Sequence, residues 1–280
     1  GDWSSDVCSS DLEKIKNKEN MVILDGRPYT EYRKMSIPTA MCCPNGELPL
    51  RIDDIVTSPE TTIVINCAGR TRSIIGAQTL INLGIKNKVL ALENGTQGWY
   101  LADFALDHGA VKRHPLTVDP AAAKQRQARA RELAKKHHVP FVSGEQVQKW
   151  LAQTDRTTFL CDVRTPEEFA QGSIPGAQHT PGGQLVQATD QYVGVRGARL
   201  VLFDSDGARA PAMASWLAML GWEVAVCDDA LQFNWNQTAS SNAVVKTALE
   251  KISATQLKDV LASETPVLDL RVSTKYREGH

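Results

Sequence analysis

One cysteine stands in a short segment whose neighbours could make it reactive. Cys67 follows the apolar run 63–66 and precedes Ala68-Gly69-Arg70-Thr71-Arg72-Ser73, after which a helical pattern begins. This order predicts a thiol at the carboxyl end of a strand, facing the first turn of a helix, where open α/β sheets bind ligands. Unpaired N–H groups, the helix dipole and two arginines favour an anion at that place. We therefore expect Cys67 to be an ionised nucleophile that a reactant can reach.

The alternative is a structural role for the same residues. An isolated cysteine is more often a small core residue than a reactive one. The polar, glycine-containing continuation after Cys67 argues against a core position, and Gly69 adds the backbone freedom that a ligand-binding loop needs. Arg70 and Arg72 are expected to bind an anion, with an ordinary surface role as the alternative.

An internal repeat organises the elements that must hold this loop. Asp25 lies over Asp162 and Gly84 over Gly221, so residues 25–84 match residues 162–221 at a constant offset of 137. In the first copy, the runs 21–25, 63–66 and 89–92 are typical of buried strands. The run 73–83 has helical spacing and stops at Gly84. Strand, helix and strand in this order predict an α/β fold with a mainly parallel central sheet flanked by helices in each copy.

Further segments extend the repeat. A third copy begins near the end of the sequence, where the residues from Ser253 and the run 267–271 match parts of the second copy. The run 120–138 predicts a solvated linker helix whose basic face is not expected to bind nucleic acid. Residues 1–12 have no periodicity and are interpreted as a non-native leader. The predicted division is this leader, a first repeat at 13–112, a linker at 113–138, a second repeat at 139–240 and the truncated start of a third at 250–280.

The second copy departs from the first at the reactive position. At the offset of 137, Cys67 falls on Asp204 and Arg72 falls on Arg209. A carboxylate cannot replace a sulfur nucleophile, and Asp206 beside it would repel an anionic reactant. Asp204, Asp206 and Arg209 are therefore expected to form a degenerate, silent site. An acid–base pair of the two aspartates is less favoured, because no histidine lies near them in the sequence.

Together these features resemble a rhodanese homology domain. The likeness rests on Asp25-x-Arg27, Ile37-Pro38-x-Ala40, the loop 67–73 and Asn94-Gly95-x-x-Gly98-Trp99. The chain is similar to bacterial rhodanese-related sulfurtransferases built from tandem domains. The resemblance implies that Cys67 takes the outer sulfur of thiosulfate or a persulfide donor and passes it to cyanide or a thiol. It also implies that the donor is bound by Ala68, Gly69, Arg70, Thr71, Arg72 and Ser73.

The resemblance also frames the partners and the competing functions. Small-molecule donors and acceptors are expected, with a protein as an alternative sulfur acceptor and with no cofactor or metal. Cysteine phosphatases use a similar loop with five residues between cysteine and arginine, whereas four separate Cys67 from Arg72, which favours sulfur over phosphate. The competing class is a non-catalytic array of rhodanese-like domains in which Cys67 senses redox state or persulfides.

Composition sets the remaining limits. The chain has 280 residues, 31 basic and 32 acidic side chains, and a net charge of -1, which gives no general argument for nucleic acid. No apolar stretch reaches the roughly 18 residues that a membrane span requires. The six cysteines form no Cys-x-x-Cys pair, so neither a disulfide framework nor a zinc site is expected, and the cytoplasm is the expected compartment. Cys42 and Cys43 could resolve a persulfide on Cys67, although loop packing is the favoured interpretation.

Overall fold

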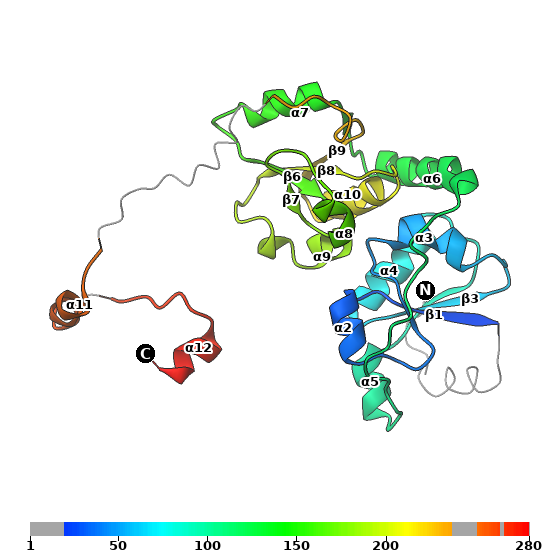
Figure 1. Cartoon of the computed structure of the whole chain (residues 1–280), viewed down its shortest axis with the longest axis horizontal. Coiled ribbons are helices and arrows are strands. Elements are labelled where there is room, and N and C mark those ends of the chain that lie inside the picture. Colours follow the sequence, from blue (N-terminus) through cyan, green and yellow to red (C-terminus); the bar gives the residue numbers. More distant parts are fainter. Residues whose placement is uncertain (1–19, 237–250, 264–265, 280) are drawn as a thin grey trace. The chain divides into compact units, whose positions relative to one another are not determined.

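Two parallel sheets form the centre of the chain in a computed structural model that describes residues 20–236, 251–263 and 266–279 (Figure 1). The strand orders are β2-β1-β3-β4 and β5-β9-β8-β6-β7, and the paired strands run parallel in both. The predicted fold class is confirmed. Among the described residues, 20–236 form one compact unit and those from 251 onwards belong to another. The predicted leader at 1–12 lies outside the described residues.

The first repeat alternates strands with helices over residues 21–101. Its elements are β1 (Met21–Asp25), α2 (Tyr29–Lys34), β2 (Met41–Cys42), α3 (Leu48–Ile55), β3 (Thr62–Asn66), α4 (Thr71–Asn82), β4 (Val89–Ala91) and α5 (Gly95–Leu101). The strands and the helix predicted on either side of Cys67 are present. Helix α4 ends where Gly84 adopts a φ of 75°, a left-handed conformation that glycine reaches at little cost.

The second repeat spans residues 141–227 after a helical connection, and it reproduces this order from β6 to β9 after an additional strand and helix, β5 and α7. The connection comprises η1 (Pro120–Ala122) and α6 (Ala123–Lys136). The repeat comprises β5 (Phe141–Val142), α7 (Gly144–Leu151), β6 (Thr158–Asp162), α8 (Pro166–Ala170), β7 (Gln178–His179), α9 (Gly182–Gln187), η2 (Thr189–Gln191), β8 (Arg199–Phe203), α10 (Arg209–Met219) and β9 (Glu223–Cys227). Strands β6, β7 and β8 start at the offset of 137 from β1, β2 and β3, so the sequence repeat is a structural one.

Each sheet is covered on both faces, which explains why its central strands are apolar throughout. In the first repeat, α3 and α4 pack on the face that carries Leu24, Ile63 and Ile65. Helices α2 and α5 cover the opposite face, where Ile23 and Val64 lie. In the second repeat, α6, α9 and α10 share one cluster and α7 packs on the other side of the sheet. Because the paired strands run parallel, their carboxyl ends lie at one edge of each sheet, where the Cys67 and Asp204 loops begin.

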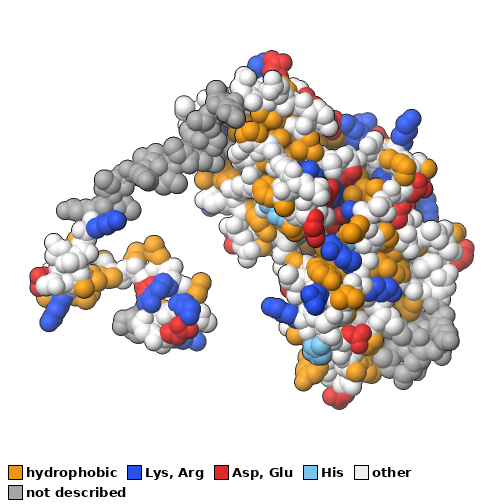
Figure 2. Space-filling model, in the orientation of Figure 1, with side chains coloured by type: hydrophobic (Ala, Val, Ile, Leu, Met, Phe, Trp, Pro, Cys, Tyr) orange, Lys and Arg blue, Asp and Glu red, His pale blue; other side chains and the backbone are white. Residues whose placement is uncertain are grey.

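The two repeats meet through equivalent positions. A Cβ atom added to Gly46 would lie 2.7 Å from the amide nitrogen of Gly183, its counterpart at the offset of 137. Trp216 Nε1 donates to Thr79 Oγ1 at 2.8 Å, and these two positions are also counterparts. Contacts between equivalent residues indicate a pseudo-two-fold interface, as in an isologous dimer. A cavity of about 310 Å³ lies between the repeats. Charged side chains of both signs gather on the surface where they meet (Figure 2).

Helix α6 is part of the core, and the prediction that it is solvated is wrong. Ala130, Leu133 and Ala134 are buried against α10, and Arg126 is only 2% exposed. The Arg126 guanidinium pairs with Asp53 at 3.2 Å and with Asp54 at 2.7 Å, both at the end of α3. Part of the basic face therefore compensates carboxylates of the first repeat.

An ion pair within an Asp-x-Arg segment occurs three times in the described residues. In the first two repeats, Arg27 binds Asp25 and Arg164 binds Asp162, each with a shortest N–O distance of 2.6 Å. Arg271 binds Asp269 in the same way in the C-terminal unit, which contains α11 (Ala254–Leu261) and α12 (Ser273–Glu278). Each arginine also donates to the carbonyl eight residues further on.

The predicted strand-like run of the third copy is not a strand among the described residues. Residues 266–270 have no regular structure, and the Leu268 and Leu270 side chains are 82% and 93% exposed. A strand requires a hydrogen-bonded neighbour, and no described strand pairs with this run. In the described part of the chain, no helix has both the length and the apolar character needed to cross a membrane.

Candidate functional site

Strand β3 delivers Cys67 to the carboxyl edge of the first sheet, and the start of α5 fixes its backbone. Thr96 donates to the Cys67 carbonyl oxygen from its amide at 2.8 Å and from its hydroxyl at 2.9 Å. The Gln97 amide donates to the Ala68 carbonyl oxygen at 2.9 Å. Gly95 is required at this contact, because its φ is 54° and a Cβ atom there would lie 2.3 Å from the Cys67 carbonyl oxygen. The conformation of the loop is therefore set by a neighbouring element.

The Cys67 sulfur lies inside the loop and receives a hydrogen bond. Ser73 Oγ lies 3.0 Å from Cys67 Sγ, and the hydroxyl donates to the sulfur. Cys67 is 1% exposed and Ser73 is fully buried. The expectation of a thiol that a reactant can reach is thus wrong for this conformation, because the Cys67 side chain is buried. A hydroxyl donor at this distance stabilises a sulfur anion.

The two loop arginines have different surroundings. Arg72 forms a bidentate ion pair with Glu31 of α2, with distances of 2.8 and 2.9 Å. The hydrogen bond from Arg72 lowers the pKa of the Glu31 carboxyl below its ordinary value. Arg70 is exposed, and no ion pair to it occurs within the described ranges. Arg72 therefore fixes the loop to α2, and Arg70 is the cation that remains directed to solvent.

The backbone amides of the Cys67 loop have no internal acceptor. Across the described residues, no carbonyl or side-chain oxygen accepts from the amides of Ala68 to Ser73. These N–H groups surround the start of α4, where the helix dipole also favours negative charge. An unpaired set of amides at such a place can hold a small anion.

The second repeat shows the same loop with its amides occupied. Asp204 accepts hydrogen bonds from the amides of Gly207 and Ala210, each at 2.7 Å, and a longer one of 3.3 Å from that of Asp206. Asp206 accepts from the amides of Ala208 and Arg209 at 2.9 and 3.1 Å. At the offset of 137, these donors correspond to the amides of residues 69–73 in the first repeat. The loop conformation is therefore one that binds anionic oxygens.

The Asp204 carboxyl has a shifted pKa. Burial and, second, the neighbouring Asp206 carboxylate raise the pKa of Asp204 to about 7, against the lowering effect of Arg209 and of the amides of Ala210 and Gly207. The amides of residues 206–210 all donate to one or other of these carboxylates, so none of them is left to bind an external anion. The predicted degenerate site is a closed structure, although its catalytic silence remains a prediction.

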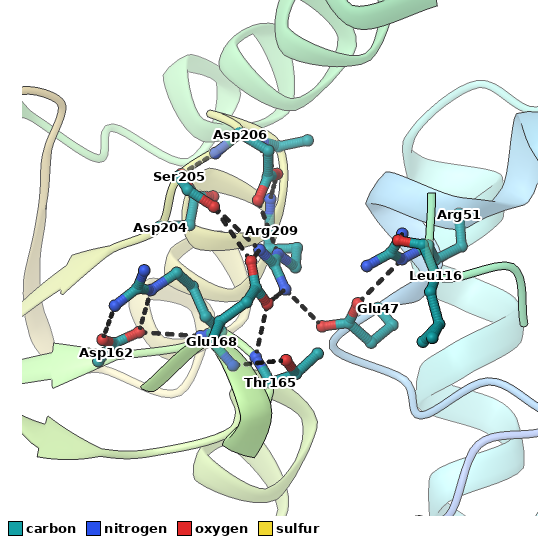
Figure 3. Close-up of polar contacts among 12 residues, drawn as sticks. Glu47, Arg51, Leu116, Asp162, Thr165, Glu168, Asp204, Ser205, Asp206 and Arg209 are labelled. Carbon is teal, nitrogen blue, oxygen red and sulfur yellow. Dashed lines mark hydrogen bonds and ion pairs between the residues drawn. The ribbon is translucent and has the colours of Figure 1, made fainter. Parts of the chain in front are cut away.

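Arg209 joins this loop to the first repeat (Figure 3). Its guanidinium lies 2.7 Å from Asp206 and Glu168 and 2.8 Å from Glu47 of the first repeat. Although burial alone would lower it, the carboxylates of Glu47 and Asp206 raise the pKa of Arg209 well above its ordinary value. Burial alone would raise the pKa of Glu168, but hydrogen bonds from Arg209 hold it at about 2. The Arg209–Glu168 pair is the counterpart of Arg72–Glu31.

The remaining described cysteines are buried core thiols. Burial raises the pKa values of Cys42, Cys161 and Cys227 to about 12, and that of Cys43 well above its ordinary value. Cys42 lies in β2 and Cys43 follows it, so the alternative of a persulfide-resolving thiol has no support at either position. Packing accounts for both residues.

Three features of the site are absent from the predictions: the Ser73–Cys67 hydrogen bond, the role of Glu31 and the contact of Asn45 with the loop. Asn45 Nδ2 donates to the Arg72 carbonyl oxygen at 2.8 Å. The repeat contains a signal for Glu31, because Glu31 and Arg72 recur as Glu168 and Arg209 at one offset. The Asn45 contact has no signal in the sequence, since it joins residues 27 positions apart and depends on how the segment after β2 lies beside the start of α4.

Comparison with known proteins agrees with this architecture. The rhodanese-like domain family matches residues 9–102 and 143–233, so the chain belongs to that family. The crystal structure of a thiosulfate sulfurtransferase from Pseudomonas aeruginosa is 46% identical in sequence, with a TM-score of 0.78. The match covers 82% of this chain and 43% of that one.

A second relative matches over a shorter region. A candidate sulfur carrier protein, YrkF of Bacillus subtilis (strain 168), is 34% identical over 107 residues, which is 35% of this chain and 56% of YrkF. The chain therefore spans less than half of the Pseudomonas protein and little more than half of YrkF.

Proposed function

We propose that the chain is a sulfurtransferase in which Cys67 carries sulfane sulfur. The Cys67 thiolate attacks the outer sulfur of thiosulfate, the bond between the two sulfur atoms breaks, and sulfite leaves with the electron pair. Cys67 then holds a persulfide. Cyanide or a thiolate attacks the outer sulfur of this persulfide, so that thiocyanate or a new persulfide forms and the Cys67 thiolate is regenerated.

The contrast between the two loops carries this proposal. In the second repeat, the amides at the start of α10 bind carboxylate oxygens of Asp204 and Asp206. In the first repeat, Gly69 replaces Asp206 and Cys67 replaces Asp204, which leaves equivalent amides available to the anionic part of a donor or a persulfide. Similarity to a thiosulfate sulfurtransferase supports thiosulfate as the donor.

The other loop residues have separate proposed roles. Ser73 donates to the Cys67 sulfur and stabilises it as an anion. Arg70 attracts the anionic donor from solvent, because its guanidinium is exposed beside the cysteine loop. Ala68, Gly69 and Thr71 contribute backbone N–H groups, and Arg72 holds the loop on α2 through Glu31.

Replacement of the nucleophile tests the proposal. We expect Cys67→Ala to abolish thiosulfate:cyanide sulfur transfer and to prevent the mass gain of one sulfur atom that thiosulfate produces in the wild type. The matched control is Cys227→Ala, which removes a buried thiol from the second repeat and should retain both properties. Equal activity of Cys67→Ala and the wild type would eliminate the proposed enzyme.

A persulfide-holding protein without turnover is the second candidate function. The burial of Cys67 and the likeness to a candidate sulfur carrier favour it. The same assay separates the two functions. A chain that gains one sulfur from thiosulfate but does not discharge it to cyanide or to small thiols is a carrier or sensor, whereas multiple turnovers identify the transferase.

We also propose that the repeats are separate rhodanese-like domains at 13–112 and 139–240, with a third beginning at residue 250. The third start is supported by two local features. Ser253 Oγ accepts from the Gln256 amide at 3.2 Å, as Ser143 does from Gln146 at 3.3 Å. The Asp269–Arg271 pair repeats the pairs of the first two copies.

A further inference from the structure

Asn45 connects the loop that carries Cys67 to the second repeat. We propose that Asn45 is a positioning residue for this loop and that the second repeat fixes Asn45 through Gly183. The inference deepens the function proposed for Cys67 and rests on it. It assigns a role in sulfur transfer to the repeat that has no cysteine.

The Asn45 side chain is held on the loop by close packing. Asn45 is 3% exposed, and its Nδ2 donates to the Arg72 carbonyl oxygen at 2.8 Å. Its own amide donates to the Gly26 carbonyl oxygen at 3.1 Å. Cβ atoms added to Gly26 and Gly76 would lie 2.1 and 2.4 Å from Asn45 Oδ1, so both glycines make room for this amide group. The Asn45 side chain therefore has little freedom, and the carbonyl it holds lies within the Cys67 loop.

The second repeat packs closely against Asn45 and the residue that follows it. A Cβ atom added to Gly183 would lie 3.1 Å from Asn45 Cβ and 2.9 Å from the Gly46 amide nitrogen. Two residues after Asn45, Glu47 accepts the ion pair from Arg209 at 2.8 Å. The segment 45–47 is thus held by the second repeat from one side and holds the Cys67 loop on the other.

The distribution of residues between the repeats favours a role in chemistry over a role in folding. The structural pairs Asp25–Arg27 and Glu31–Arg72 recur in the second repeat at the offset of 137. Cys67, Ser73 and Asn45 do not recur, and their counterparts are Asp204, Ala210 and Gly182. Asn45 therefore accompanies the cysteine and its hydroxyl donor, whereas the folding contacts are present in both copies.

The physical basis is the precision that an anion-binding loop requires. The Arg72 carbonyl belongs to the first turn of α4, next to the unpaired amides of the Cys67 loop, so a shift of that carbonyl reorients these donors. A displacement of about 1 Å in a catalytic group can reduce a rate about 100-fold. Release of the carbonyl should also expose the buried Cys67 sulfur.

The first test changes one atom of the side chain. Asn45→Asp removes the donor to Arg72 with little change in shape. We expect kcat for thiosulfate:cyanide transfer to fall about 10- to 100-fold, with a much smaller change in KM. We also expect iodoacetamide to alkylate Cys67 faster, as followed by peptide mass spectrometry. Asn87→Asp is the matched control, because Asn87 Nδ2 also holds backbone carbonyls, those of Ser58 and Thr61, at 2.8 and 2.9 Å.

The second test acts from the other repeat. Gly183→Ala adds a methyl group whose three nearest atoms all belong to Asn45 and Gly46. We expect a smaller loss of kcat, about three- to tenfold, and again faster alkylation of Cys67. Gly194→Ala is the control in the same repeat, because a Cβ atom there meets nothing within 4 Å.

The outcomes separate this inference from the function on which it rests. An inactive wild type would overturn the proposed transferase, while the alkylation rates would still test the position of the loop. If Asn45→Asp and Asn87→Asp alter the alkylation of Cys67 equally, or if neither alters it, Asn45 is a folding residue and the inference fails. If Asn45→Asp has the expected effects but Gly183→Ala matches Gly194→Ala, the part assigned to the second repeat is wrong.

Discussion

At the scale of single residues, the Cys67 sulfur and its hydrogen-bond donor are present together in the first repeat and absent together in the second. Cys67 receives its hydrogen bond from Ser73 in the first repeat. The counterparts in the second repeat are Asp204 and Ala210, and there the amide of Ala210 donates to the Asp204 carboxylate instead. A hydroxyl donor is needed only beside the sulfur, because the Asp204 carboxylate already accepts its hydrogen bonds from backbone amides.

This pairing makes Ser73 a sensitive position. Ser73→Ala removes a hydrogen bond to the sulfur anion, and such bonds to charged groups contribute about 1.5 to 3 kcal/mol. We therefore expect kcat/KM for thiosulfate:cyanide transfer to fall about tenfold or more, as measured in a steady-state assay. Ser215→Ala is the control, since Ser215 is also fully buried on a helix but donates to the Pro211 carbonyl oxygen at 2.8 Å. Unchanged kcat/KM in Ser73→Ala would show that the hydroxyl only packs.

The residues proposed to carry chemistry follow from the sequence pattern, but their structural partners do not. The position of Cys67 before a glycine and two arginines indicates an anion-binding loop. The burial of its sulfur follows from the path of the loop, which the contacts of Thr96 and Gln97 determine. The bidentate pairing of Arg72 also depends on where α2 packs. Such contacts join residues separated by about 30 to 40 positions, which short-range patterns do not reveal.

At the scale of elements, one strand-loop-helix unit exists in two forms. In the first, the amides before α4 have no acceptor among the described residues, and in the second the amides before α10 bind Asp204 and Asp206. The loop before α10 carries an unfavourable electrostatic interaction between its two aspartates. Two partly buried carboxylates share one loop, and the pKa of Asp204 is raised to about 7.

The raised pKa predicts how stability depends on pH. In the unfolded chain Asp204 has its ordinary pKa of 3.8, whereas in the folded chain it keeps its proton up to a pH of about 7. The folded state therefore binds more protons in this window, and the Asp204 contribution to the free energy of unfolding decreases as pH rises through it. From about pH 5 to pH 8 the decrease should be on the order of 2 kcal/mol. Urea unfolding at both pH values measures it.

Asp204→Ala provides the comparison. The variant leaves amides without an acceptor and should be less stable at both pH values, but it should lack the Asp204 part of the pH dependence. Glu168 does not interfere, because its lowered pKa of about 2 places its effect below pH 5. Identical pH dependence in the wild type and the variant would show that Asp204 is already ionised at pH 5 in the folded chain.

Helix α6 shows where element-level prediction succeeds and where it stops. Its limits follow from its composition, and the alanines define an apolar stripe. The fate of its basic residues does not follow, since Arg126 is buried on Asp53 and Asp54, about 70 positions away. A buried arginine requires compensating carboxylates, and these can be identified only once α3 and α6 are placed together.

At the scale of the molecule, the pseudo-two-fold interface is symmetric in shape and asymmetric in charge. Gly46 meets Gly183 and Thr79 meets Trp216, each pair at equivalent positions. The ion pair between Glu47 and Arg209 has no symmetry equivalent. The counterpart of Glu47 is the uncharged Gln184, and the counterpart of Arg209 is Arg72, which pairs with Glu31 of its own repeat. Arg209 therefore has a partner across the interface that Arg72 lacks.

This asymmetry predicts unequal effects of the same substitution at the two equivalent positions. Arg209→Met leaves three carboxylates, those of Glu47, Glu168 and Asp206, without their buried cation, which should lower the free energy of unfolding by about 3 to 5 kcal/mol. Arg72→Met leaves only Glu31, whose side chain is 37% exposed and can be solvated, so a loss of about 1 kcal/mol is expected. Urea denaturation of both variants measures the difference.

Glu47→Gln, which removes only the carboxylate across the interface, should lower the free energy of unfolding by an amount between these two losses. Equal losses in Arg209→Met and Arg72→Met would contradict a stabilising role for the contact between the repeats.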